Sequence, residues 1–241
     1  MSAASQNLPA QARRADALRG TVRVPGDKSI SHRALILAGM ATGTSKISGL
    51  LEGADVLATM RAMQALGAHI EQHDNSDWHV TGVGPMGLTA PAEALDFGNA
   101  GTGVRLVMGL VAGAGIGARF IGDASLSTRP MERILQPLRL MGAQAQATNG
   151  YLPVMIESAV LMPAVITPDI ASAQVKSAIL LAALGVAGTT IVREKIATRG
   201  HSETMLRLMG ADIRSHEKDG YSEVSLHNEN GPTKLKATDL H

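Results

Sequence analysis

Residues 25–33 read Pro-Gly-Asp-Lys-Ser-Ile-Ser-His-Arg, and the pattern predicts that an extended segment turns here into an apolar helix. The Pro-Gly pair breaks the preceding strand, and Ser29 or Ser31 is expected to cap the helix. Lys28 and Arg33 bring two positive charges to the helix N-terminus, whose free backbone N–H groups also favour an anion. The stretch therefore predicts a phosphate or carboxylate site, with an ordinary capped helix and solvated charges as the alternative.

A similar helix start occurs three times, each with small or polar residues followed by a basic residue. The basic residues are Arg33, Arg105 and Lys176, which lie 72 residues (33 to 105) and 71 residues (105 to 176) apart. A short β-branched or apolar segment follows each helix, and then comes a second, amphipathic helix. The first helices are predicted over 29–37, 101–108 and 172–180, the short segments over 45–48, 118–121 and 189–193, and two of the second helices over 55–66 and 131–141.

The second helices end alike, with a glycine after the last apolar residue. Gly67, Gly142 and Gly210 stand where a helix C-cap needs a left-handed conformation. Two strand-like pieces then close each unit, at 69–72 with 79–82, 144–147 with 153–156 and 212–216 with 223–226. Three β-α-β-α-β-β repeats are therefore predicted to share a core, with helices inside and sheets outside or the reverse. The first helices are apolar nearly all round, so we expect them to be the more buried set, with N-termini converging on one rim.

Composition limits what such a protein binds. The 241 residues are 45% hydrophobic and 18% charged, and the formal net charge of +1 gives no bulk attraction to nucleic acid or a membrane surface. An aromatic content of 2% argues against base stacking, and the lack of cysteine excludes disulfides and thiolate metal sites. The apolar run 178–188 falls far short of the ~20 residues that a transmembrane helix needs.

The two ends of the chain resemble each other. Residues 17–24 and 233–241 share an alternation of apolar and polar positions, which is typical of strands. The tail therefore reads as a second copy of the head, and the chain is predicted to be one half of a duplicated protein.

Four segments resemble the 5-enolpyruvylshikimate-3-phosphate synthase family, in order and in spacing. They are residues 25–33, 97–105 (Phe-Gly-Asn-Ala-Gly-Thr-Gly-Val-Arg), 122–131 and 171–177. The resemblance is to bacterial members and runs from about Leu18 to the end. It implies an α/β fold, an inside-out α/β barrel lobe of three repeats, which is one of two lobes with the active site in the cleft between them.

The resemblance also implies an activity. Members of this family transfer the enolpyruvyl group of phosphoenolpyruvate to the 5-hydroxyl of shikimate 3-phosphate, in the pathway to chorismate and the aromatic amino acids. The implied protein is a cytoplasmic transferase without metal or cofactor. The implied partners are the two substrates and the missing second lobe, with no nucleic acid and no membrane.

The domain organisation expected from this resemblance has four parts. They are a disordered tail over 1–17, an inter-lobe crossing strand over 18–26, a substrate-binding lobe over 27–232, and over 233–241 the start of the crossing back to the second lobe. The repeats of the lobe are expected at about 27–98, 99–168 and 169–232.

Residue by residue, the resemblance implies two overlapping sets of contacts. Shikimate 3-phosphate is expected to contact Lys28, Ser29, Arg33, Ser172, Gln174 and Arg199. Phosphoenolpyruvate is expected to contact Lys28, Asn99, Gly101, Thr102, Arg129 and Gln174. Local capping or a surface charge is the alternative for Asn99, Thr102 and Arg199. Arg33 is expected to serve the ligand, with little effect on stability.

No catalytic residue is assigned, because the acid/base groups of the family are expected in the missing lobe. Asp55 and Asp123 are interpreted as caps or loop residues. His69 and His73 have i,i+4 spacing but leave a helix cap as a strand, which makes a metal pair improbable. The chain alone is therefore expected to bind substrate without turning it over.

Two other functions stay open at this stage. A related lobe that acts on UDP-N-acetylglucosamine shares the fold, although Lys-Ser-Ile-Ser-His-Arg at 28–33 favours the shikimate enzyme. A non-catalytic anion-binding domain is the alternative of a different class. In the family, the inhibitor glyphosate occupies the phosphoenolpyruvate site, and tolerant relatives carry alanine at the position of Gly101.

Overall fold

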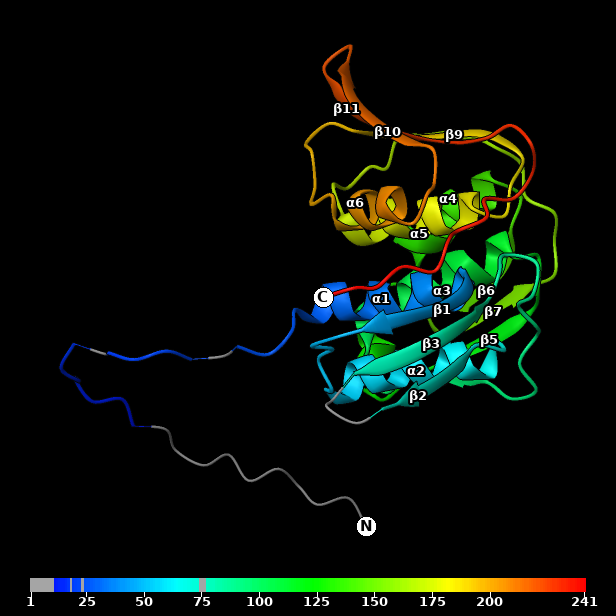
Figure 1. Cartoon of the computed structure of the whole chain (residues 1–241). Helices are drawn as coiled ribbons and strands as arrows, with labels where there is room; N and C mark the ends of the chain where they lie inside the picture. Colours follow the sequence, from blue (N-terminus) through cyan, green and yellow to red (C-terminus); the bar gives the residue numbers. More distant parts are fainter. Residues whose placement is uncertain (1–10, 18, 23, 74–76) are drawn as a thin grey trace.

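The computed structural model describes residues 11–17, 19–22, 24–73 and 77–241 (Figure 1). Residues 11–17 are exposed and carry no helix or strand, while 1–10 of the expected tail lie outside the described residues. Residues 19–22 and 24–26 also form no strand, and Val22 and Val24 are 85% and 76% exposed. The inter-lobe crossing expected at 18–26 stays a prediction, and Leu18 and Arg23 lie outside the described residues.

The described chain is a mixed α/β fold, as predicted, and its elements repeat in order. The first unit holds α1 (Lys28–Met40), β1 (Thr42–Ile47), α2 (Ala54–Ala65), β2 (His69–Gln72) and β3 (Trp78–Val83). The second holds β4 (Leu95–Asp96), α3 (Gly101–Gly113), β5 (Ala118–Ile121), the 3-10 helix η2 (Leu126–Thr128), α4 (Glu132–Leu140), β6 (Gln144–Thr148) and β7 (Tyr151–Glu157). The third holds β8 (Val165–Ile166), α5 (Ala173–Ala183), β9 (Gly188–Glu194), α6 (His201–Leu208), β10 (Ile213–Lys218) and β11 (Tyr221–Asn228).

Each unit contributes one sheet of matching strand order. The second and third sheets run β4-β5-β7-β6 and β8-β9-β11-β10, with the first pair of each parallel and the others antiparallel. In the first sheet, β1-β3-β2, no parallel strand precedes α1 among the residues that the structure describes. The C-terminal segment takes that place: the Thr42 N–H donates to the Leu235 carbonyl (2.9 Å), and the Leu240 N–H donates to the Lys46 carbonyl (2.8 Å). In Figure 1 the red C-terminal segment accordingly runs beside β1.

The glycine caps predicted from the sequence are present. Gly67, Gly142 and Gly210 have φ angles of +109°, +105° and +92°, which is the left-handed region that glycine adopts without strain. The residue after each glycine donates its N–H back into the last helical turn, as Ala68 does to the Met63 carbonyl at 3.0 Å. This pattern closes α2, α4 and α6 and turns the chain into the next strand.

The first helices of the three units are buried and pack against one another between the sheets (Figure 1). Helices α3 and α5 approach most closely where Gly109 and Gly113 face Ala178 and Ala182. A Cβ at Gly109 would lie 2.1 Å from the Ala178 carbonyl oxygen, and a Cβ at Gly113 would lie 2.2 Å from that of Ala182. The two backbones therefore touch, which leaves room for no side chain between them and sets their N-termini side by side.

This contact predicts that Gly109→Ala destabilises the protein. The new methyl group would overlap backbone atoms that cannot move without separating α3 from α5, so the free energy of unfolding should fall by roughly 1–3 kcal/mol. Gly117→Ala is the control, since a Cβ there would be 3.5 Å from its nearest neighbour. Urea unfolding of both variants is the measurement, and equal losses would mean that the helix contact is looser than described.

Candidate anion-binding site

The N-cap of helix α1 lies two residues before Ser29 and four before Ser31, the two serines predicted to cap it. Asp27 is the N-cap, and its Oδ1 accepts the N–H of Ile30 at 2.8 Å. The prediction of a Ser29 or Ser31 cap is therefore wrong, because the carboxylate directly after Gly26 reaches the free N–H groups first. The Ser31 hydroxyl instead accepts the N–H of Leu51 at 3.0 Å.

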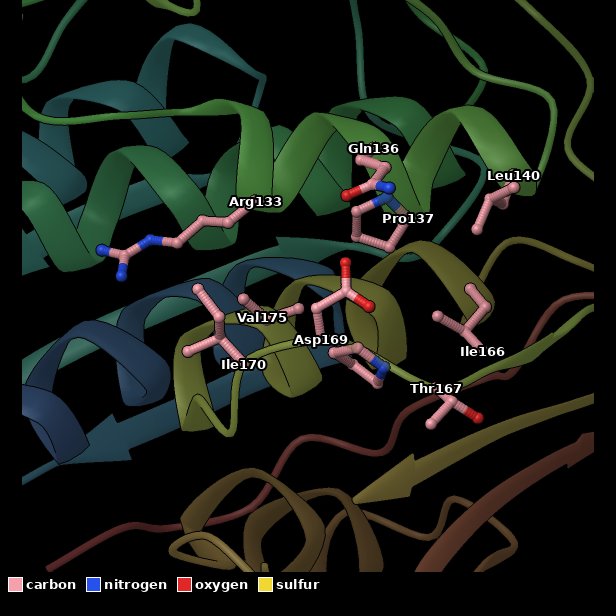
Figure 2. Close-up of a pocket in the computed structure, with 10 residues that line it drawn as sticks. Arg133, Gln136, Pro137, Leu140, Ile166, Thr167, Asp169, Ile170 and Val175 are labelled. Atoms are coloured by element: carbon pink, nitrogen blue, oxygen red, sulfur yellow. The ribbon is translucent and has the colours of Figure 1, made fainter. Parts of the chain in front are cut away.

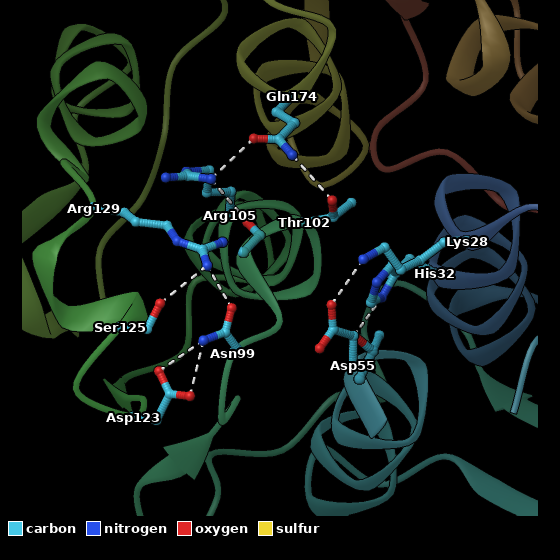
Figure 3. Close-up of polar contacts among 12 residues, drawn as sticks. Lys28, His32, Asp55, Asn99, Thr102, Arg105, Asp123, Ser125, Arg129 and Gln174 are labelled. Carbon is cyan, nitrogen blue, oxygen red and sulfur yellow. Dashed lines mark hydrogen bonds and ion pairs between the residues drawn. The ribbon is translucent and has the colours of Figure 1, made fainter. Parts of the chain in front are cut away.

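Lys28 lies at the start of α1 and points toward α2 (Figure 3). Its Nζ is 3.0 Å from Oδ2 of Asp55, and the lysine side chain is 56% exposed. Asp55 stands in the first turn of α2, whose N-cap is Gly53, so the interpretation of Asp55 as a cap or loop residue is wrong. The pair holds the lysine head at the rim while leaving much of it open to a ligand.

His32 lies beneath this pair and is fully buried. Its Nδ1 is 2.8 Å from the Thr59 hydroxyl, and among the described residues Nε2 has no hydrogen-bond partner. Burial, in part offset by Asp55, lowers the pKa of His32 to about 4. The imidazole is therefore neutral at physiological pH and supports the rim by packing.

Arg33 is only 5% exposed and joins three helices. Its Nε donates to the Ser202 hydroxyl at 2.7 Å, its Nη2 to the Ser177 hydroxyl at 2.8 Å, and its Nη1 to the Ser29 carbonyl at 2.9 Å. Burial lowers the pKa of Arg33, and Glu203 partly offsets that effect. Three such contacts argue against the expectation that Arg33 has little effect on stability, and both its effect on stability and its contact with a ligand stay predictions.

The N-termini of α3 and α5 are joined by side chains (Figure 3). Gln174 donates from Nε2 to the Thr102 hydroxyl at 3.0 Å, and its Oε1 accepts from Arg105 Nη1 at 3.1 Å. Arg105 Nη1 also donates to the Gly101 carbonyl at 3.2 Å. The guanidinium therefore fixes which end of the Gln174 amide faces Thr102.

Arg105 was singled out in the sequence only as the basic residue of the second repeat, and not as a site residue. Arg105 occupies the same position in the second repeat as Arg33 does in the first, and this equivalence would have identified it as a candidate site residue. Arg105 is 4% exposed, and burial together with Arg133 and Arg129 lowers its pKa to about 10. No acidic side chain among the described residues forms an ion pair with it, so this end of the site carries uncompensated positive charge.

Arg129 is held by the turn that precedes α3. Its Nη2 donates to Asn99 Oδ1 and, at 3.3 Å, to the Ser125 hydroxyl. The Asn99 amide in turn donates to both carboxylate oxygens of Asp123, at 3.1 and 2.9 Å. Asp123 also accepts the Leu126 N–H at 2.7 Å, which is the main cause of its lowered pKa and confirms its interpretation as a loop cap.

Gly101 opens α3 directly beside two guanidinium groups. A Cβ at this position would lie 3.0 Å from Arg129 Nη1 and 3.2 Å from Arg105 Nη1. The absence of a side chain therefore gives both arginines and any bound anion access to the start of α3.

Of the remaining predicted residues, Ser172 and Arg199 lie in the third unit and Ser29 lies in the first. Ser172 caps α5 and accepts the Val175 N–H at 3.5 Å. Arg199 lies exposed in the loop between β9 and α6, outside the polar contacts drawn in Figure 3. Ser29, by contrast, lies on α1 beside Lys28, with its carbonyl bonded to Arg33.

A separate cavity of about 270 Å³ lies between α4 and residues 166–170 (Figure 2). It is lined by Arg133, Gln136, Pro137, Leu140, Ile166, Thr167, Pro168, Asp169, Ile170 and Val175. None of the residues predicted to bind substrate lines it.

The described residues hold no group of three histidines or carboxylates placed to bind a metal ion. His69 and His73 both hydrogen-bond to Glu71, at 3.3 and 2.9 Å. Over the same described ranges, no helix has the length and apolar character needed to cross a membrane.

Taken together, these observations define an α/β protein in which helix N-termini, one lysine and several arginines lie near one another, groups of the kind that complement an anion. A sequence model of EPSP synthase (3-phosphoshikimate 1-carboxyvinyltransferase) matches residues 12–236, and the chain belongs to this family. The resemblance noted from the sequence motifs is thereby confirmed.

Individual relatives agree with the family match. The 3-phosphoshikimate 1-carboxyvinyltransferase of Nitrobacter winogradskyi is 54% identical over 222 residues, which are 89% of this chain and 49% of that protein. The protein of the same name from a Bradyrhizobium species is 55% identical over 216 residues, 88% of this chain and 48% of its own length. The EPSP synthase structure from Acinetobacter baumannii superposes with a TM-score of 0.84 at 45% identity, over 91% of this chain and 48% of that one. The chain thus spans about half the length of its relatives.

The burial of His32 predicts a pH dependence of stability. In the unfolded chain the imidazole takes up a proton as the pH falls below 6.5, whereas in the folded protein it does so only near pH 4. Stability is therefore lost as the pH falls through this window, and a shift of this size corresponds to roughly 3 kcal/mol.

Urea unfolding between pH 7 and pH 4 should show a shallower loss for His32→Asn than for the parent chain. His69→Gln is the control, since the His69 side chain is 71% exposed. An unchanged slope in His32→Asn would contradict a neutral, buried His32.

Proposed function

We propose that this chain is the shikimate-3-phosphate-binding lobe of an EPSP synthase. The full enzyme transfers the enolpyruvyl group of phosphoenolpyruvate to the 5-hydroxyl of shikimate 3-phosphate and releases phosphate. The observation that supports this proposal most directly is the polar cluster at the starts of α1, α3 and α5, together with the family match. Both substrates carry a phosphate and a carboxylate, which such a cluster complements.

The two substrates are proposed to share this cluster. Lys28, Ser29, Arg33, Ser172, Gln174 and Arg199 form the proposed shikimate-3-phosphate set. Lys28, Asn99, Gly101, Thr102, Arg129 and Gln174 form the proposed phosphoenolpyruvate set. Lys28 and Gln174 belong to both sets, and they lie on α1 and α5, with Thr102 at the start of α3 drawn between them in Figure 3.

Within this cluster the side chains orient and neutralise the substrates. Lys28 Nζ and the Arg129 guanidinium supply positive charge where phosphate or carboxylate groups bind, and Asn99 holds Arg129 in place. Asp55 is engaged by Lys28, and Asp123 by Asn99 and Leu126. Neither carboxylate is free for proton transfer, so we expect the acid/base groups in the part of the relatives that this chain does not span.

The proposal includes the arrangement of the whole lobe. We infer an inside-out lobe, with α1, α3 and α5 innermost and three sheets around them, and with repeats at about 27–98, 99–168 and 169–232. A second lobe is the proposed partner, and the cytoplasm is the proposed location. The lobe that acts on UDP-N-acetylglucosamine is not favoured, because the matching family and the relatives from Nitrobacter and Bradyrhizobium are named for the shikimate reaction.

The proposal predicts that the purified chain binds shikimate 3-phosphate but does not turn it over. Titration calorimetry should show saturable binding, and a phosphate-release assay with both substrates should stay at background. Lys28→Met is the binding control, because it keeps the stem and removes the charge at the rim. Steady turnover by the purified chain would contradict the assignment of the proton-transfer groups elsewhere.

A further prediction concerns glyphosate and Gly101. A methyl group at this position would press on Arg129 Nη1. Gly101→Ala should therefore weaken the binding of glyphosate more than the binding of the smaller phosphoenolpyruvate. Steric discrimination of this kind amounts to ~1–3 kcal/mol, or about ten- to a few hundredfold in the ratio of inhibition constant to Michaelis constant.

Inhibition of a full-length enzyme that contains this chain, competed against phosphoenolpyruvate, is the measurement. Gly117→Ala is the control, because it adds the same methyl group away from the arginines. Unchanged inhibition by glyphosate in Gly101→Ala would show that the methyl group does not reach the inhibitor.

A further inference from the structure

A buried ion cluster lies in the third unit and has no place in the function proposed above. Lys176 on α5 is 2% exposed, and its Nζ is 2.7 Å from Glu194 Oε2 and 2.8 Å from Glu203 Oε1. Glu194 ends β9 and Glu203 stands in the first turn of α6, so the lysine joins three elements.

The same cluster fastens the loop that carries Arg199. Lys176 Nζ donates to the Thr198 carbonyl at 3.3 Å. The Thr198 hydroxyl donates to Glu194 Oε1 at 2.6 Å, and its N–H donates to Glu194 Oε2 at 3.3 Å. Thr198 is therefore held on its N–H, its carbonyl and its side chain, one residue before the exposed Arg199.

The cluster is also coupled to the start of α1. Glu203 acts on the charge of Arg33, and Ser202, its neighbour on α6, accepts the Arg33 Nε at 2.7 Å. Lys176 pairs with both glutamates, and Arg33 is influenced by Glu203 alone of the two, while Glu203 Oε2 has no hydrogen-bond partner among the described residues. Groups from α1, α5 and the loop before α6 are thus held in one arrangement.

Stability alone does not explain a cluster of this kind. A buried ion pair often contributes no more to stability than well-packed apolar residues would, because both charges lose their hydration. The buried cations at the corresponding positions of the other units have different partners. Arg33 donates to serine hydroxyls, and Arg105 has no acidic partner among the described residues. What is particular to the third unit is the loop that the cluster fastens.

We propose that Lys176, with Glu194 and Glu203, positions residues 195–200 so that Arg199 reaches an anionic group of the ligand bound at α1 and α5. Lys176 is a positioning residue and does not touch the ligand. The identity of that ligand as shikimate 3-phosphate rests on the proposed function. The positioning of residues 195–200 by Lys176 does not depend on the proposed function.

The test separates positioning from stability with a pair of variants. Lys176→Met removes the charge and the bond to Thr198, and it leaves Glu194 without an ion-pair partner among the described residues. Lys176→Met combined with Glu194→Gln neutralises the carboxylate that has lost its cation and leaves Glu203 with Arg33, but it does not restore the bond to Thr198. Arg193→Met is the matched control, because it breaks another ion pair of this sheet, Arg193 with the buried Glu223 at 2.6 Å.

Three quantities are measured for each protein: the Kd for shikimate 3-phosphate, the hydrogen exchange of residues 195–200, and unfolding in urea. We expect Lys176→Met to weaken binding by about ten- to a hundredfold, the loss of one charge-assisted contact. Exchange in the loop should accelerate. The double variant should regain stability while its binding stays weak and its loop exchanges fast, and Arg193→Met should lose stability but bind within about twofold of the parent chain.

Two results would overturn the proposal. One is recovery of binding in the double variant together with stability, and the other is an equal loss of binding in Arg193→Met. If the parent chain fails to bind shikimate 3-phosphate, the proposed function fails, and loop exchange still tests the positioning. Unchanged exchange at residues 195–200 in both Lys176 variants would then refute it.

Discussion

The contact between the backbones of α3 and α5 is the constraint on which the site depends. Because Gly109 and Gly113 present no side chain to Ala178 and Ala182, the two helices run close enough for their first turns to share polar groups. Gln174 then reaches Thr102, and Arg105 reaches Gln174, without any long loop between them. The polar cluster is therefore held by regular elements of the core, which keeps its geometry more exact than loops would.

The first helices of the three units each contain a buried cation, and each cation is stabilised by different partners. Each buries a cation near its N-terminus, where the helix dipole already disfavours positive charge. Arg33 is solvated by serine hydroxyls and a carbonyl, Lys176 is neutralised by two glutamates, and Arg105 has carbonyl and amide oxygens only. The charge that the protein leaves uncompensated is concentrated at α3, beside Arg129 and Arg133. An anionic ligand at that end would relieve a cost that folding has already incurred.

Much of the fold could be read from periodicity, because helix length and glycine caps are local properties. The strand at 69–72 and the caps at Gly67, Gly142 and Gly210 were placed correctly. What the sequence did not predict correctly depends on competition between possible N-cap residues and on contacts between residues far apart in the sequence. A serine was predicted to cap α1, but Asp27 is the N-cap, because neighbouring side-chain acceptors compete for the same backbone N–H groups. The Lys28–Asp55 pair joins residues 27 apart, and the Gln174–Thr102 bond joins residues 72 apart, so both depend on packing that no local pattern encodes.

The strand-like pairing of residues 235–240 with β1 bears on how the chain folds. Lys46 and Asp239 are hydrogen-bonded across 193 residues of sequence, so the first sheet gains its outer strand only after both later units are complete. Until then, β1 carries an open edge with free N–H and C=O groups, which invites pairing with another chain. The large sequence separation of this pairing makes the docking of residues 235–240 on β1 a late step and links the first unit to the segment that follows the third. An intermediate in which residues 235–240 have not yet paired would accordingly expose the edge of β1.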